Sequence, residues 1–132
     1  MPIVVEQLNE ATRQDQQDLQ KIYRDAPSWL LEPFSDATQL IRDCLEDGSL
    51  IAARFNDRLL GAARLQRHQN AWHLSQMCVR NVTRRRGVAE RLVSEAQRMA
   101  LQEGAQLRLL APAGHLIAQA LAAKLKLPLD EG

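Results

Sequence analysis

The sequence predicts one α+β domain over residues 1–132, with a central mixed and mostly antiparallel sheet flanked by helices. Short apolar runs typical of strands are interspersed with amphipathic patterns of helical period. Three of the strand-like runs follow one another across short polar turns, which favours antiparallel pairing. A strand-helix-strand unit then follows, which indicates a mixed sheet. With 132 residues the chain is long enough for one core and too short for two.

The chain opens with a short β-branched run over residues 2–8, which predicts the first strand. A helix is expected within residues 11–26, because apolar residues recur there at helical spacing and Thr12 is a suitable N-cap. The apolar stripe of this helix consists of Leu19, Ile22 and Tyr23. The next segment, SWLLEPF at residues 28–34, shows no clear period.

A second helix is predicted over residues 36–46, with Ser35 or Asp36 as its N-cap and Gly48 after its end. Its apolar residues fall at i, i+3, i+4, i+7 and i+8, the spacing of one buried helix face. They are Ala37, Leu40, Ile41, Cys44 and Leu45.

Two apolar runs, Leu50–Phe55 and Leu59–Leu65, predict a β-hairpin. The Asn56-Asp57-Arg58 segment joins them, and Asn and Asp tolerate the backbone conformations of a tight turn. A third strand is expected over Ala71–Val79, which extends the antiparallel meander.

The remaining chain predicts a helix from Val88 to Gly104, a strand over Leu107–Ala111 and a last helix over Gly114–Leu125. The tail KLPLDEG contains a proline and indicates no partner strand.

Charge and composition narrow the functional classes. A formal net charge of +1, from 17 basic and 16 acidic residues, excludes a protein that binds nucleic acid through overall charge. No apolar run has the length of a membrane span and the start resembles no secretory signal, so we expect a cytoplasmic protein. Cys44 and Cys78 are expected to be buried thiols, and no ligand spacing predicts a metal.

The most informative segment is TRRRGVAE, residues 83–90, which places three arginines between a predicted strand and a predicted helix. A helix N-terminus carries unpaired N–H groups and the positive end of the helix dipole, and Gly87 allows the main chain to approach a ligand. Arginines at this point would add bidentate donors for phosphate, which predicts a pyrophosphate site.

Several other interpretations of the arginine segment differ in strength. A solvated basic turn that only closes the strand-helix connection is an open alternative. A P-loop is excluded because its lysine and hydroxyl residue are missing, and a dinucleotide-binding Rossmann motif because only one glycine is present. A nucleic-acid site is a weaker candidate, since only Trp72 lies nearby as a stacking group.

Residues 82–93, VTRRRGVAERLV, resemble motif A of the GCN5-related N-acetyltransferases (GNAT), a loop of the form Arg/Gln-x-x-Gly-x-Gly/Ala. Arg84, Gly87 and Ala89 fill the positions of that motif. The resemblance implies the GNAT fold, in which the loop amides bind the pyrophosphate of acetyl-CoA and the preceding strand pairs with the pantetheine arm.

A closer resemblance joins DLQKIY (18–23), AARFNDRLLGAARL (52–65) and VRNVTRRRGVAERL (79–92) to the PanZ family, also called PanM. These are small acetyl-CoA-binding proteins that bind the aspartate 1-decarboxylase proenzyme, promote its self-cleavage to the pyruvoyl form and regulate it in response to acetyl-CoA. The resemblance therefore implies a regulator of β-alanine, pantothenate and coenzyme A biosynthesis.

The resemblance also assigns residues. The RFN hairpin implies that Arg54 and Asn56 contact the decarboxylase, although Asn56 is equally explained as a turn former. The implied acetyl-CoA contacts are Met77, Cys78 and Val79 through strand backbone, and Thr83, Arg84, Arg85, Arg86, Gly87, Val88, Ala89 and Glu90 in the loop and helix start.

Whether the chain transfers the acetyl group depends on an acid and a base. Members of the superfamily commonly place the acid, a tyrosine, in the last helix, whereas the single tyrosine here is Tyr23 in the first. His73 is a candidate base, but a lone strand histidine is more often structural. His115 resembles a first-turn surface residue. A non-catalytic sensor is therefore favoured, with an N-acetyltransferase acting on a small-molecule or protein amine as the alternative.

Overall fold

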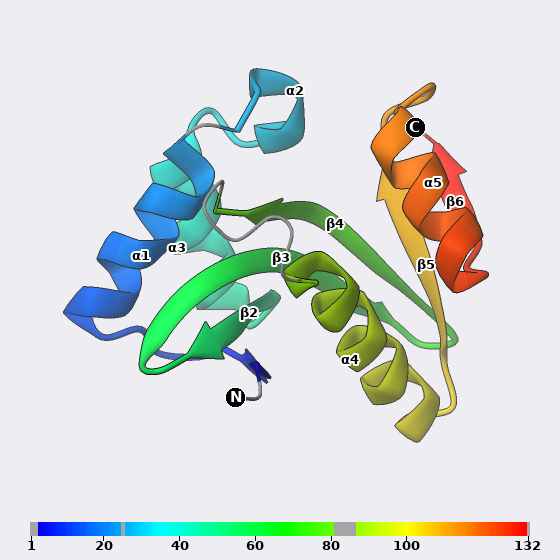
Figure 1. Cartoon of the computed structure of the whole chain (residues 1–132), viewed down its shortest axis with the longest axis horizontal. Helices are drawn as coiled ribbons and strands as arrows, with labels where there is room; N and C mark the ends of the chain where they lie inside the picture. The colour runs from blue at the N-terminus through cyan, green and yellow to red at the C-terminus, as the bar shows by residue number, and fades with distance from the viewer. Residues whose placement is uncertain (1–2, 25, 81–86, 132) are drawn as a thin grey trace.

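The computed structural model describes residues 3–24, 26–80 and 87–131, which form a six-stranded sheet with helices on both faces (Figure 1). The strand order in the sheet follows the chain, from β1 to β6. The strands are β1 (Val4–Gln7), β2 (Leu50–Phe55), β3 (Arg58–His68), β4 (Ala71–Val79), β5 (Gln106–Ala111) and β6 (Leu129–Glu131). The helices are α1 (Arg13–Arg24), α2 (Ser28–Leu31), α3 (Ala37–Asp47), α4 (Val88–Gln102) and α5 (Leu116–Leu125).

The sheet is mixed, as predicted. Strands β1 to β4 pair antiparallel in sequence, and β5 and β6 then add in parallel. Asn56 and Asp57 take positive φ angles of 49° and 67°, so the predicted tight turn between β2 and β3 is confirmed. These left-handed conformations explain why Asn and Asp occupy the two positions.

The expectation that the C-terminal tail has no partner strand is wrong. Residues Leu129–Glu131 form β6, which pairs in parallel with the end of β5. Pro128 lies just before the strand, where its carbonyl accepts a hydrogen bond from the Leu109 N–H at 2.9 Å. Three residues are too few to produce a recognisable strand period, so the pairing is visible only in the fold.

An acidic side chain anchors this last strand. Asp130 accepts hydrogen bonds from Arg108 Nε and Nη2, both at 2.8 Å, and His73 Nε2 lies 2.8 Å from its Oδ2 atom. The Arg108 and His73 hydrogen bonds hold the pKa of the Asp130 carboxyl well below its usual range. The charge network therefore joins β4, β5 and β6 side by side.

Two hydrophobic clusters lie on opposite faces of the sheet. One lies under α4 and α5 and contains Val88, Leu92, Leu107 and Leu109. The other lies under α1 and α3, where the predicted stripe of α1 is buried and that of α3 is buried except for Ala37 and Leu45, which are partly buried. Its fully buried members include Leu19, Leu40, Cys44, Leu50 and Leu59.

Local hydrogen bonds set the starts of the first two long helices. Thr12 Oγ1 accepts from the Asp15 N–H at 3.0 Å, and Asp36 Oδ1 accepts from the Gln39 N–H at 2.8 Å, as the predicted N-caps require. Gly48, with φ of 75°, ends α3 in the left-handed conformation. None of the helices in the described part of the chain is both long and apolar enough to cross a bilayer.

Candidate functional site

Strands β4 and β5 form a fork. They pair only from Ala71 with Gln106 to Leu74 with Leu109, and beyond this point the two strands diverge (Figure 1). A β-bulge causes the divergence, because Gln76 and Met77 on β4 lie opposite a single residue of β3, Ala63. Gln76 takes a φ of 48°, which bends β4 away from β5.

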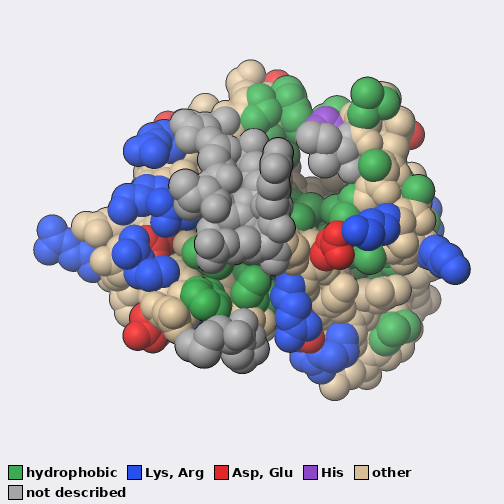
Figure 2. All heavy atoms as spheres, viewed as in Figure 1, with side chains coloured by type: hydrophobic (Ala, Val, Ile, Leu, Met, Phe, Trp, Pro, Cys, Tyr) green, Lys and Arg blue, Asp and Glu red, His purple; other side chains and the backbone are tan. Residues whose placement is uncertain are grey.

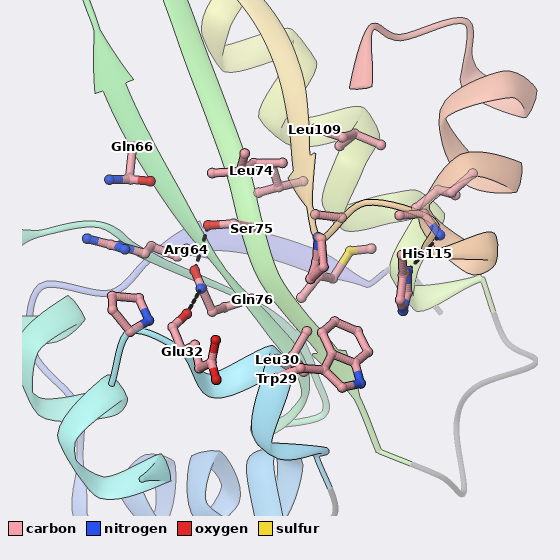
Figure 3. Close-up of a pocket in the computed structure, with 17 residues that line it drawn as sticks. Trp29, Leu30, Glu32, Arg64, Gln66, Leu74, Ser75, Gln76, Leu109 and His115 are labelled. Atoms are coloured by element: carbon pink, nitrogen blue, oxygen red, sulfur yellow. Dashed lines mark hydrogen bonds between the residues drawn. The ribbon is translucent and has the colours of Figure 1, made fainter. Parts of the chain in front are cut away.

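Two segments from the first third of the chain hold this bulge in place. The Tyr23 hydroxyl on α1 donates to the main-chain carbonyl of Gln76 at 2.7 Å. The side chain of Gln76 donates to the main-chain carbonyl of Glu32 at 2.7 Å and accepts from the Ser75 hydroxyl at 2.6 Å (Figure 3). Tyr23 is buried, and this burial raises the pKa of its phenol well above the usual value, so the group stays protonated.

The first turn of α4 packs against the diverging end of β4. Gly87 precedes the helix with φ of 74° and provides no side-chain cap. A Cβ atom at Gly61 on β3 would lie 3.0 Å from Val88 Cγ1 and 3.1 Å from Val79 Cγ2. Gly61 therefore permits the close approach of the helix start to β3 and β4.

A single carboxylate lies in the first turn of α4. Glu90 Oε1 is 2.5 Å from Lys124 Nζ on α5, so the ion pair joins the helices on either side of the fork. The pairing directs the negative charge of Glu90 toward Lys124. An anion at the helix start consequently meets less repulsion than an unpaired glutamate would produce.

The structure describes seven of the eleven predicted cofactor contacts. Met77, Cys78 and Val79 lie on the diverging part of β4, and Gly87, Val88, Ala89 and Glu90 begin α4. The two groups come together beside Gly61, because Val79 and Val88 occupy the space that a Cβ atom at Gly61 would need. The predicted contacts Thr83, Arg84, Arg85 and Arg86 lie outside the described residues.

Burial restricts what these residues can present to a ligand. Val88 is fully buried, and the Cys78 thiol is turned toward α1, where its Sγ donates to the Ile22 carbonyl at 3.1 Å. Their side chains are therefore part of the protein interior. Contact with a ligand at these two positions would use main-chain atoms, as the resemblance implies.

A cavity of about 360 Å³ opens at the fork, between α2 and the start of α5 (Figure 3). In the view of Figure 2 the surface is hollowed between these two elements, and hydrophobic side chains line both rims. The Trp29 and His115 rings form part of the lining, with their centroids 4.3 Å apart. Apolar walls are contributed by Leu30, Leu74, Met77, Leu109, Leu110 and Leu121.

The two candidate catalytic histidines have different positions. His115 was expected to be a first-turn surface residue, and this expectation is wrong. It is the half-buried N-cap of α5, where its Nδ1 accepts from the Ala118 N–H at 3.1 Å, and it lines the cavity. His73 instead binds Asp130 on β6, in agreement with the structural interpretation of this residue.

The hairpin between β2 and β3 is attached to α1 by two arginines. Arg54 pairs with Asp15 and with Glu6, each at 3.0 Å, and these hydrogen bonds raise the pKa of its guanidinium. Arg58 pairs with the fully buried Asp18 at 2.7 Å. Asn56 lies at the tip of this braced hairpin, so its turn role is confirmed, while a partner contact stays a prediction.

Solved structures of known acetyltransferases share this architecture. The ribosomal-protein-S18-alanine N-acetyltransferase from Escherichia coli aligns with a TM-score of 0.72 at 17% identity, over 94% of this chain and 76% of the other. The PaiA N-acetyltransferase from Thermoplasma acidophilum, solved in complex with coenzyme A, aligns with a TM-score of 0.67 at 15% identity, over 95% and 89% of the two chains. The predicted GNAT fold is therefore confirmed.

Residues 2–129 match the family described as "Acetyltransferase (GNAT) domain, PanZ". The chain belongs to the PanZ family. Two curated relatives of this PanZ-family chain, both named "PanD regulatory factor", come from Salmonella typhimurium and Escherichia coli. They are 39% and 35% identical to it over 98 residues, which are 74% of this chain and 68% of each relative.

Sequence reasoning missed some of the residues that shape the site of this PanZ-family chain. Gly61 was a detectable signal, because a glycine inside a strand indicates a bulge or a close approach of another segment. Gln76 carried no such signal, since a glutamine at a positive φ angle is set by its neighbours in space. Glu32 contributes through its main-chain carbonyl, which any residue could provide.

Proposed function

We propose that this chain binds acetyl-CoA at the fork and regulates the aspartate 1-decarboxylase proenzyme by promoting its maturation. The family assignment and the two relatives named "PanD regulatory factor" support the regulatory role. The resemblance of TRRRGVAE to motif A supports the cofactor.

The geometry suits a cofactor with a long arm and a pyrophosphate. The diverging segment of β4, including Met77 to Val79, provides an extended edge for the pantetheine arm. The 15-residue helix α4 begins close by, and its first-turn N–H groups and dipole favour phosphate oxygens. Gly87 adds no side chain that would obstruct the approach. Arg84, Arg85 and Arg86 would contribute side-chain charge.

The position of Tyr23 favours a regulator over a transferase. The chain has one tyrosine, which is buried in α1. Its hydroxyl donates a hydrogen bond to the Gln76 main-chain carbonyl. A group in this position supports the shape of the bulge and is not available to protonate a departing thiolate. We therefore propose a sensor that binds acetyl-CoA without transferring its acetyl group.

The test uses the purified chain and unprocessed decarboxylase, mixed with and without acetyl-CoA, with chain cleavage followed by gel electrophoresis. We expect faster cleavage and a stable complex in the presence of the chain. Unchanged cleavage together with no complex would contradict the regulatory role. A parallel assay of thiol release from acetyl-CoA across a panel of amines should stay at background, whereas turnover above background would support the transferase alternative.

A further inference from the structure

Two buried polar atoms lack a hydrogen-bond partner within the described part of the chain. They are the hydroxyl oxygen of Ser49, between α3 and β2, and the Nε atom of Arg64 on β3. The main-chain groups of Ser49 are paired, since its N–H donates to the Cys44 carbonyl at 3.0 Å and its carbonyl accepts from the Leu65 N–H at 2.6 Å. An unpaired buried polar atom destabilises a fold, so the two atoms require an explanation.

The two atoms belong to neighbouring positions in the sheet. Leu50 pairs with Arg64 across β2 and β3, and Ser49 directly precedes Leu50. Ser49 and Arg64 also share a neighbour on α3, because burial raises the pKa of the Cys44 thiol while Ser49 and then Arg64 act to lower it. Cys44 is fully buried and Ser49 is only 7% exposed. Three polar side chains therefore meet in the interior, where the end of α3 lies over β3.

The Arg64 side chain is restrained by an aromatic ring. Its guanidinium carbon lies 5.0 Å from the centroid of the Phe34 ring, which favours a fixed stacking arrangement. The Nε atom is closed off from the solvent in this arrangement. A partner for Nε must therefore come from inside the protein.

We infer that one ordered water molecule occupies this interior site and links the end of α3 to β3. The water would accept hydrogen bonds from the Arg64 Nε–H and the Cys44 thiol, and it would donate one to the Ser49 hydroxyl. Buried waters make about three hydrogen bonds to polar groups that have no other partner, and these three side chains provide that number.

The surrounding charges favour water over a chloride ion, which the positive charge of Arg64 would otherwise attract. Asp47 and Asp43 lie close enough to act on the pKa of the same Cys44 thiol, which they raise. The C-terminal end of the 11-residue helix α3 adds a partial negative charge. An anion would be repelled by both, whereas a neutral water can donate and accept at the same site.

This interior water site is distinct from the cavity at the fork. Arg64 lines that cavity with other atoms, but its Nε atom has no exposed surface. The inference therefore does not depend on the proposed regulatory function or on acetyl-CoA binding.

A high-resolution crystal structure of the chain, grown in bromide in place of chloride, tests the site directly. We expect a water peak within hydrogen-bond distance of both Ser49 Oγ and Arg64 Nε, with no anomalous bromide signal. A bromide peak would identify a halide site, and a direct hydrogen bond between the two side chains or an absence of density would show that no water is bound. Each of these results would overturn the inference.

Urea denaturation of Ser49→Ala gives a second test, in which the sign of the effect decides. If a water bonds the hydroxyl, removing it should raise the unfolding equilibrium constant by about 5- to 30-fold. If the hydroxyl has no partner, removing it should leave the constant unchanged or lower it. Ser94→Ala, at an exposed serine of α4, is the control and should change the constant by less than about 2-fold.

A double-mutant cycle then identifies Arg64 as the other partner. Arg64→Met keeps an unbranched apolar stem but removes the Nε–H group. Because either substitution removes the bridge, the double variant should be destabilised by clearly less than the product of the two single fold-changes. A purely multiplicative result would overturn the shared water. If Arg64→Met does not fold, the Ser49→Ala result decides, and a constant that is not raised would overturn the inference.

Discussion

The phenolic oxygen of Tyr23 on α1 lies 2.7 Å from the main-chain carbonyl oxygen of Gln76, the residue at which β4 bulges away from β5. This hydrogen bond connects the first helix of the chain to the fork where the cofactor is proposed to bind. Its strength therefore affects both the stability of the fold and the shape of the site.

Replacing Tyr23 with Phe should remove the donor and leave the partly buried carbonyl of Gln76 without that partner. The expected loss is about 1 to 3 kcal/mol in the free energy of unfolding, measured by urea denaturation. Acetyl-CoA affinity, measured by calorimetry, should fall as well. As a control, Ser35→Ala removes an exposed hydroxyl bonded to Gln39 and should change stability by less than about 0.5 kcal/mol. Equal effects of both variants would contradict the assigned role.

Replacing Gly61 with Ala should place a methyl group about as close as 3.0 Å to Val88 and displace the start of α4. Overpacking of this kind costs about 1 to 3 kcal/mol. The compensating double variant Gly61→Ala/Val88→Ala tests the contact, because removing the Val88 methyl groups should make the Gly61 substitution less costly. Strictly additive losses in urea denaturation would show that the two positions do not interact.

Asp130 should make part of the stability depend on pH. The pKa of Asp130 is lowered in the folded state, chiefly by Arg108 and then by His73. The ionised carboxylate therefore stabilises the fold fully above the unfolded pKa of about 3.9, and this stabilisation is lost as the pH falls through the lower folded pKa. Asp130→Asn should therefore destabilise the protein at pH 7, and the difference from the parent should shrink below about pH 3. Glu46→Gln, at an exposed residue of α3, is the control in urea denaturation at both pH values. A pH-independent difference would contradict the prediction.

One substitution of Asn56 separates its turn role from a partner contact. Asn56→Gly keeps a residue suited to the φ of 49° but removes the side-chain amide, so the fold should keep nearly its full stability. If the amide contacts the decarboxylase, co-purification of the complex should nevertheless be lost. Retention of the complex by a stable Asn56→Gly variant would assign the residue to the turn alone.

Replacing Arg85 with Ala should weaken acetyl-CoA binding by about 1.5 to 3 kcal/mol if its guanidinium contacts a phosphate. Calorimetry with acetyl-CoA and with CoA gives the measurement and also the contribution of the acetyl group. Arg42→Ala, at an exposed arginine of α3, controls for the change in overall charge. Equal affinities of the Arg85 variant and the parent would remove this arginine from the site.

Much of the fold could be predicted because its elements have local causes. The stripes of α1 and α3, the caps at Thr12 and Asp36, and the turn at Asn56 and Asp57 all follow from spacing and residue type. The tail was missed because β6 has three residues and its pairing depends on a partner strand about 20 residues earlier.

The candidate site was predictable to the extent that one continuous motif encodes it. By itself, the sequence determined the positions of Gly87 and the first turn of α4, the absence of any tyrosine other than Tyr23, and the family resemblance. Only the tertiary structure decided that β4 bulges at Gln76, that Tyr23 holds the bulge, and that Arg64 and Glu32 line one cavity. The physical reason is that a sequence motif predicts only the contacts between residues that are close together along the chain. The bulge and the cavity instead arise from hydrogen bonds and charges contributed by α1, the segment after α2, β3 and β4, which meet only after folding.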